Sequence, residues 1–256
     1  EFQAITNIKQ IDANVIRDLL QWLELTGHNP GGRHAVYRTS KTFIRWWINE
    51  IEPDDYQDPF KKVKPPKLIK TPLEPVSMET VKGLLGTCKP NELTGSRDRS
   101  IILLLIDTGI RANELINITL DDVDLLTGSV LIRQGKGGKF RTVFFGKTCR
   151  RSIKAYLKIR NDQSQYLFVT ADNEPFTYFG LRGMITRRSK YAGIDPPALH
   201  DFRRAFALGM LRNGVDVYTL QKLMGHADLQ VLRTYLAQNN NDLAAAHKRF
   251  GLADRM

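Results

Sequence analysis

Two arginines, a lysine, two histidines and a tyrosine in the last two-thirds of the chain could together break a phosphodiester bond. In chain order they are Arg111, Lys136, His200, Arg203, His226 and Tyr235. A guanidinium group can bind two non-bridging phosphate oxygens at once, and it stays charged when it is desolvated. A tyrosine oxygen can attack phosphorus if the forming phenolate is stabilised, because the hydroxyl has a pKa of about 10. These residue types therefore suit the holding, neutralising and covalent attack of a nucleic-acid backbone.

Each of these residues also has an ordinary structural interpretation when it is taken alone. Tyr235 lies in residues 228–236, which have the apolar spacing of a short helix, and a tyrosine there usually packs half-buried. Arg111 could pair on the surface with Glu114, one helical turn away, and Lys136 could belong to a plain basic turn. His-x-x-Arg by itself is a common surface pair. Only the combination favours chemistry.

His200 and Arg203 are three residues apart at the start of HDFRRAFALGML, which has the pattern of a helix. This spacing places both side chains on one face, and the amino end of a helix favours an anion. For this reason Arg203, rather than Arg204, is predicted to clamp the phosphate. Arg111 follows Gly109 at the start of a further expected helix, RANELINI.

The candidate residues lack the clustered carboxylates with which metal-dependent nucleases work. The acids nearest to them in the sequence, Glu114 and Asp201, are expected to orient the basic groups. Exchange of one phosphate ester for another needs no ATP. The GKT at Gly146 also lacks the upstream glycine of a nucleotide-binding P-loop, because Arg141 stands there. We therefore expect no metal and no cofactor.

The composition is that of a globular protein that binds a polyanion. The formal net charge of the 256 residues is +11, with 42% of them hydrophobic and 25% charged. Excess cationic side chains gain affinity for DNA by displacing its counterions. No apolar run is long enough to span a membrane, and no secretory signal is recognisable. The two cysteines, Cys88 and Cys149, lie far apart and indicate a reducing, cytoplasmic setting.

Residues 1–66 are predicted to form a helical domain. Asp12 is a plausible N-cap of its first helix, residues 27–32 have the composition of a turn, and a second helix follows. The aromatic residues of this second helix are expected in the core: Phe43, Trp46 and Trp47. Its other faces carry three candidates for contact with DNA phosphates, with a solvated basic face as the alternative: Arg38, Lys41 and Arg45.

A basic linker is predicted over residues 67–74. The segment KKVKPPKLIK, residues 61–70, contains five lysines that would repel one another without an anionic partner, and its two prolines keep the backbone extended. Four of these lysines are predicted to contact DNA: Lys61, Lys62, Lys64 and Lys67. The second domain then occupies residues 75–256.

The second domain has a mainly helical pattern with one β-hairpin. SVLIRQ and RTVFFG have the composition of two strands joined by the glycine-rich turn GKGGK. Lys136 lies in this turn, where its ammonium group could reach a leaving oxygen. For Lys139 and Arg141 we expect either a plain basic turn or a contact with the DNA backbone. The tail after Tyr235 is expected to contain a short helix.

In order and spacing, the candidate residues resemble the signature of the tyrosine recombinase (phage integrase) family. This signature is an arginine, a lysine, His-x-x-Arg, Gly-His, and a tyrosine nine residues beyond the second histidine. TGIRANEL is similar to the family's first arginine box, and LMGHADLQVLRTYL to its last box. The resemblance covers roughly residues 71–250 as a catalytic domain, and the helical amino-terminal part is similar, more loosely, to the family's SAM-like core-DNA-binding domain. It implies a mainly α fold with a small antiparallel β-hairpin or sheet, in which a helical domain precedes an α+β catalytic domain.

The resemblance also implies a role for each matching residue. Tyr235 would attack the scissile phosphate and form a 3′-phosphotyrosine with a free 5′-hydroxyl. Arg111 and Arg203 would clamp the non-bridging oxygens. Where the family often has a histidine after the second arginine, this chain has Arg204, which adds charge near the site and is predicted to contact DNA.

The three other roles concern protons and hydrogen bonds. Lys136 would protonate the departing 5′-oxygen, His200 would assist proton transfer at the tyrosine, and His226 would hydrogen-bond the phosphate.

The expected partner is double-stranded DNA that carries recombination sites. In the family, the terminal segment docks into a neighbouring protomer. We therefore expect a homo-tetramer on DNA, a monomer or weak oligomer without it, an accessory directionality factor as a further partner, and action at the nucleoid. A type IB topoisomerase-like enzyme, which shares the chemistry and acts as a monomer, is one alternative. A non-catalytic DNA-binding protein on the same scaffold is another.

Overall fold

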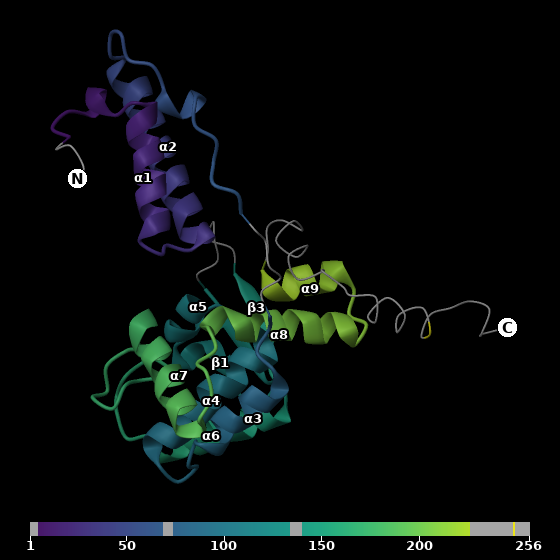
Figure 1. The fold of residues 1–256 in the computed structure, drawn as a ribbon. Helices are drawn as coiled ribbons and strands as arrows, with labels where there is room; N and C mark the ends of the chain where they lie inside the picture. Colours follow the sequence, from purple (N-terminus) through teal and green to yellow (C-terminus); the bar gives the residue numbers. More distant parts are fainter. Residues whose placement is uncertain (1–4, 69–73, 134–139, 226–247, 249–256) are drawn as a thin grey trace. The chain divides into compact units, whose positions relative to one another are not determined.

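The computed structural model describes residues 5–68, 74–133, 140–225 and 248, and it divides the chain into two compact units, Glu1–Thr71 and Pro72–Met256 (Figure 1). Each unit has its own hydrophobic core. Several predicted features lie outside the described residues: the glycine-rich turn with Lys136 and Lys139, His226, the short helix with Tyr235, and the tail helix.

In the first unit, two helices lie side by side (Figure 1). α1 spans Ala13–Leu25 and α2 spans Pro30–Ile51, with 3-10 turns at Ile8–Gln10 and Pro59–Lys61. The Asp12 carboxylate accepts hydrogen bonds from two backbone N–H groups of the first turn, which confirms Asp12 as the N-cap of α1. The small core of this unit consists of Ile16, Tyr37, Ile44, Phe60 and Val63.

The predicted turn over residues 27–32 is wrong in its second half. α2 begins at Pro30, so that Gly31 and Gly32 are helical. The reason is local, because the Asn29 side chain caps the helix by accepting from the Gly32 N–H at 2.7 Å and proline suits the first helical position.

The prediction that the aromatic residues of α2 pack in the core is wrong for two of three. Phe43 is 48% and Trp46 54% exposed, because the inward stripe of α2 is formed by Tyr37, Ile44 and their neighbours at helical spacing. Trp47 does pack inside the unit, edge-on against the ring of Tyr56 at a centroid distance of 5.2 Å.

The second unit is mainly helical, with one small antiparallel sheet, as predicted. Its helices are α3 (Met78–Gly86), α4 (Leu93–Thr108), α5 (Ala112–Ile116), α6 (Lys147–Ile159), α7 (Tyr178–Ala192), α8 (Leu199–Arg212) and α9 (Val217–Met224), with a 3-10 turn at Leu120–Asp122. Its strands are β1 (Val123–Asp124), β2 (Ser129–Ile132) and β3 (Arg141–Phe144), in the order β1-β2-β3. β2 and β3 are the two predicted strands. β1 was not predicted, because two residues carry no alternation.

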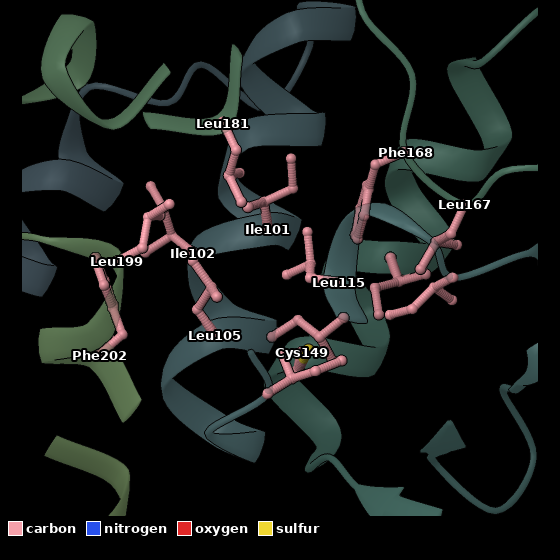
Figure 2. Packing of buried hydrophobic residues seen from close by; sticks show 14 of the residues in the cluster. Ile101, Ile102, Leu105, Leu115, Cys149, Leu167, Phe168, Leu181, Leu199 and Phe202 are labelled. Carbon is pink, nitrogen blue, oxygen red and sulfur yellow. The ribbon is translucent and has the colours of Figure 1, made fainter. Parts of the chain in front are cut away.

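The core of the second unit surrounds α4, which is apolar over most of its circumference. Figure 2 shows Ile101, Ile102 and Leu105 of α4 between Leu181 of α7 and Phe202 of α8. The α4 side chains in this core are at most 1% exposed. Full burial of such side chains contributes roughly 1.5–3 kcal/mol each, so that α4 is the fixed element against which the site residues are placed.

The two ends of α4 are tied to the helices around it. At its amino end, the buried Asp98 accepts from Arg97 and from Arg188 of α7, both at 2.8 Å. At its carboxyl end, Gly109 has φ +60°, and a Cβ atom there would lie 2.4 Å from the Phe206 ring of α8. Glycine therefore permits the close approach of α8 to the end of α4.

The helices of the described residues include none with the length and apolarity needed to cross a membrane. Cys88 and Cys149 are buried and form no disulfide.

Candidate active site

Three of the six candidate catalytic residues lie in the described part of the chain, and the structure brings them together. Arg111, His200 and Arg203 line one pocket of about 210 Å³, together with Tyr178 at the start of α7. Arg111 comes from the start of α5, and the other two from the first turns of α8. Residues 89 positions apart in the sequence thus share one concave surface, because the start of α5 and the first turns of α8 line the same pocket.

Arg203 is buried between two helix ends. It is 1% exposed, and its Nη1 donates to the Gly109 carbonyl at 2.5 Å, while its Nη2 donates to the Met224 carbonyl at 2.6 Å. The carbonyls at the carboxyl end of a helix carry partial negative charge, so that they stabilise a guanidinium group. The ends of α4 and α9 therefore fix the orientation of Arg203.

Arg111 is the N-cap residue of α5, and the Glu114 carboxylate holds it at two points. The backbone N–H of Arg111 donates to Glu114 Oε2 at 2.9 Å, and its Nη1 donates to Oε1 at 2.8 Å. Its Nη2 lies 3.4 Å from the Gly225 carbonyl. The Arg111 side chain remains 38% exposed. The pairing with Glu114 and the position in the pocket thus coexist, where the sequence left them as alternatives.

A second arginine, Arg141 of β3, also pairs with Glu114. Its Nη1 and Nη2 donate to the two carboxylate oxygens at 2.8 and 2.7 Å. Burial alone would raise the pKa of Glu114, but the hydrogen bonds from Arg141 and Arg111 outweigh it and lower this pKa to about 2. Glu114 is therefore ionised throughout the neutral range, and it has the orienting role expected for it. We call Glu114, Arg111 and Arg141 the Glu114 cluster.

The carboxyl end of α9 is where the arginines of the site meet. The carbonyls of Leu223, Met224 and Gly225 accept from Arg141, Arg203 and Arg111, at 3.2, 2.6 and 3.4 Å respectively. These are the last three residues before His226, which lies outside the described part of the chain. The basic groups of the site thus bind the backbone that leads directly into the segment with His226 and Tyr235.

His200 and Asp201 occupy the first turn of α8. Desolvation and the positive charges of Arg204 and Arg203 lower the pKa of His200, so that its imidazole is mostly neutral at pH 7 and can accept a proton. The Asp201 carboxylate accepts from the Ala198 N–H at 2.8 Å and pairs with the Arg204 guanidinium. Asp201 thereby orients the start of α8, as expected.

The predicted DNA contacts of the first unit stay predictions, but the structure shows the state of these side chains. Arg38 is exposed, Lys41 lies 5.7 Å from the Tyr37 ring centroid, and Arg45 pairs with Asp58 at 3.0 Å. Four lysines of the segment 61–70 are exposed: Lys61, Lys62, Lys64 and Lys67. The last three of them line a groove with Arg17 and Arg33.

A basic surface on α7 was missed by the sequence analysis. Arg182, Thr186, Arg187 and Lys190 line an open groove of about 500 Å³, with the largely exposed Phe179 and Tyr191 at its ends. The opposite face of α7, with Leu181, Met184 and Ile185, is buried. The sequence does contain a pattern that predicts this surface, because the basic residues of α7 recur at helical spacing opposite an apolar stripe.

Within residues 5–68, 74–133, 140–225 and 248, no group of three or more His, Cys, Asp or Glu side chains is placed to hold a metal ion. The cationic groups of the described pocket are guanidinium groups.

Comparison with known proteins places the chain among DNA recombinases. Residues 76–242 match the sequence model described as the phage integrase family. The chain is 30% identical over 249 residues to the tyrosine recombinase XerA of Thermococcus kodakarensis, covering 96% of this chain and 84% of that protein. It is 35% identical over 241 residues to the tyrosine recombinase XerC of Staphylococcus carnosus, covering 92% of this chain and 80% of that protein.

Solved structures with low sequence identity show the same fold. The Tn1549 transposon integrase in complex with a circular intermediate DNA has a TM-score of 0.75 at 17% identity, covering 94% of this chain and 86% of that chain. The XerH site-specific recombinase bound to a palindromic difH substrate has a TM-score of 0.70 at 22% identity, covering 95% of this chain and 74% of that chain. The expected fold class is confirmed.

The Glu114 cluster predicts a pH-dependent contribution to stability. The fall of the Glu114 pKa from 4.5 to about 2 corresponds to about 3 kcal/mol of unfolding free energy. Because the pKa is lower in the folded state, this contribution is complete above the unfolded value and is lost as the pH falls toward 2. Glu114→Gln should therefore destabilise the chain by an amount on the order of 3 kcal/mol at pH 7 and by progressively less below pH 4.5, as measured by urea unfolding.

Glu174→Gln, which changes an exposed carboxylate, is the control and should leave the unfolding curve unchanged. A constant difference between wild type and Glu114→Gln from pH 7 to pH 3 would contradict the assignment.

Proposed function

The chain belongs to the phage integrase family of tyrosine recombinases, and on this basis we propose that it cleaves and rejoins duplex DNA at specific sites with Tyr235 as its nucleophile. The observation that carries the proposal is the convergence of Arg111, Arg203 and the carboxyl end of α9. Two guanidinium groups suited to a phosphate lie where the chain enters the segment with His226 and Tyr235.

Arg111 and Arg203 would bind the non-bridging oxygens of the scissile phosphate. Negative charge grows on these oxygens as the fifth bond to phosphorus forms, and fixed cations stabilise that charge most strongly in a site that needs no reorganisation. The contacts of Arg203 with Gly109 and Met224 would supply the rigidity. The exposed part of the Arg111 side chain would be the part that contacts the phosphate.

The proton transfers would involve Tyr235, His200 and Lys136. Tyr235 attacks phosphorus, its phenolic proton passes toward the neutral His200, and a 3′-phosphotyrosine forms as the bond to the 5′-oxygen breaks. Lys136, between β2 and β3 in the sequence, would give its proton to that leaving oxygen, and His226 would hydrogen-bond the phosphate. Rejoining reverses these transfers on a 5′-hydroxyl, and because one ester replaces another the cycle needs no ATP.

DNA would also be bound by basic surfaces outside the pocket. In the first unit these are the predicted residues Arg38, Lys41, Arg45, Lys61, Lys62, Lys64 and Lys67. In the second unit, the groove of α7 adds Arg182, Arg187 and Lys190, and its helix begins at the pocket through Tyr178. Contacts of this kind hold and align a duplex without reading its sequence. Contacts of Lys139, Arg141 and Arg204 with DNA remain predictions.

The two alternatives raised by the sequence are less well supported. The similar proteins are named as recombinases and not as topoisomerases, and they match over most of the chain. A non-catalytic scaffold would have no need for a buried arginine fixed between two helix ends beside an exposed one.

We expect the chain to form a covalent complex with nicked DNA. Incubation in EDTA with a pool of nicked duplexes of randomised sequence, followed by a denaturing gel, should give a protein–DNA band, and the DNA recovered from it identifies the recombination site. Tyr235→Phe should remove the band, because the phenyl ring keeps the shape and loses the attacking oxygen.

Tyr218→Phe is the matched control, since Tyr218 is a 68% exposed tyrosine of α9, and it should leave the band unchanged. A band of equal intensity from Tyr235→Phe, or a wild-type band that forms only with added Mg²⁺, would refute the proposed chemistry.

We also propose that the active assembly is a homo-tetramer on two DNA sites, formed when the tail of each protomer docks on a neighbour, and that a directionality factor can bias it at the nucleoid. Removal of the tail from Leu243 onward should then leave binding of one chain to a single half-site unchanged and abolish the complex of four chains with two duplexes. Mass photometry with the recovered duplex measures both. Four-chain complexes formed by the truncated chain would contradict tail-mediated assembly.

A further inference from the structure

Arg141 pairs with Glu114 next to the pocket, and each nitrogen of its guanidinium group donates a hydrogen bond within the protein. Its three nitrogens donate to Leu223 and to both oxygens of Glu114, and its side chain is only 12% exposed. From the sequence, Arg141 was expected to belong to a plain basic turn or to contact the DNA backbone. Neither interpretation accounts for a bidentate pair with a carboxylate that is itself 5% exposed.

We propose that Arg141 is a positioning residue for strand cleavage, which acts through Glu114 on Arg111 and ties the β2–β3 hairpin to the end of α9. The inference rests on the proposed function, because the phosphate that Arg111 is held to meet is that of the cleavage reaction.

Arg141 changes the net charge of the Glu114 cluster. Arg111 and Glu114 alone form a neutral pair, which would attract a phosphate only weakly. Arg141 adds a second guanidinium group to the same carboxylate, so that the cluster keeps one net positive charge. The exposed member of the cluster is Arg111, at 38% against 12% for Arg141. The remaining charge is therefore presented on the side of the phosphate pocket.

Arg141 also connects three elements of the second unit. It lies on β3 opposite Ile132 of β2, in the last pair of the β2–β3 ladder before the stretch of sequence that contains Lys136. Its Nη atoms reach the start of α5 through Glu114, and its Nε reaches the end of α9 at 3.2 Å. One side chain thus fixes the strand that leads from Lys136, the helix that presents Arg111, and the backbone that leads to His226.

The Arg141 side chain also packs closely against Gly225. This residue has φ +63°, and a Cβ atom on it would lie 2.8 Å from Arg141 Cδ and 2.9 Å from Nε. A side chain at position 225 would displace the guanidinium group from Glu114 or move the end of α9. The close contact shows that the backbone before His226 is placed against Arg141.

Removal of Arg141 has a consequence that loss of packing alone would not produce. The charged groups that face Glu114 in the described residues are Arg111 of α5 and Arg141 of β3, and the paired Asp122 and Arg133 line the hollow beside it. Without Arg141, the desolvation of Glu114 is opposed mainly by Arg111, and its pKa rises. Protonation of Glu114 then releases Arg111 at a pH where the wild type is unaffected.

The test compares Arg141→Gln with Arg133→Gln, which removes one positive charge from the residue that follows β2. Single-turnover cleavage of the nicked duplex recovered with the wild-type chain is measured from pH 5.5 to 8.5, together with DNA affinity. We expect Arg141→Gln to lower the rate by about 10-fold or more at pH 7.5, since small misplacements of positioned groups cost rates of this size. The cleavage rate of Arg141→Gln should fall further toward acid pH. Its affinity for the DNA should stay within about 2-fold of the affinity of Arg133→Gln.

A double-mutant cycle with Glu114→Gln shows whether Arg141 acts through Glu114. In the Glu114→Gln background, Arg141→Gln should have little further effect on the cleavage rate, and the rate should not fall toward acid pH. If Arg141→Gln does not fold, as judged by circular dichroism, Arg141→Lys replaces it. A smaller loss of rate is then expected, and the fall of the rate should begin at a lower pH than in Arg141→Gln, because lysine keeps the positive charge beside Glu114 but not the bidentate pair.

Three outcomes would overturn the inference. They are a pH profile of the Arg141 variant parallel to that of the wild type, a rate loss explained wholly by weaker DNA binding, and equal effects of the Arg133 and Arg141 substitutions. If the wild type cleaves DNA and any of these three results is found, the role of Arg141 is refuted and the proposed function is not. If the wild type forms no covalent product with DNA, the proposed function is refuted and the role of Arg141 with it.

Discussion

The candidate active site depends on one shared carboxylate. Glu114 binds the backbone and the guanidinium group of Arg111 and both Nη atoms of Arg141, and these contacts keep its pKa at about 2. A buried carboxylate is unfavourable unless it is paired and hydrogen-bonded. Once both arginines are present, the cluster is satisfied and keeps a net positive charge, so that one buried acid makes the site more suitable for a phosphate.

The other constraint is the use of helix ends to frame the pocket. Arg203 lies between the carboxyl ends of α4 and α9, and Arg111 caps α5 while it reaches the end of α9. Carbonyls at helix ends lack partners within the helix, and guanidinium groups satisfy them while they remain charged. Because α4 is fixed by the core, these contacts transfer its rigidity to the groups that would meet DNA. The same contacts tie α9, and with it the approach to His226, to the basic groups.

The sequence predicted those features that are local or periodic. The cap at Asp12, the apolar α4 that ends at Gly109, and the hairpin β2–β3 follow from patterns within a few residues, and the mainly helical fold is confirmed. Arg141 could not be assigned from sequence, because its partner lies 27 residues away and a strand pattern does not show which side chain crosses to a helix end. The exposure of Trp46 was missed for a related reason, since helical spacing does not reveal which of two apolar stripes faces a partner helix.

The ionisation state of Glu114 is the most direct measure of this account, because every contact in the cluster requires the carboxylate. Selective ¹³C labelling of glutamate and assignment by Glu114→Gln would allow its carboxyl signal to be followed by NMR as the pH is lowered. The account predicts that this signal stays in the ionised form through pH 3 in the wild type and titrates at higher pH in Arg141→Gln. A signal that titrates near pH 4.5 in the wild type, as that of an unperturbed glutamate would, would contradict it.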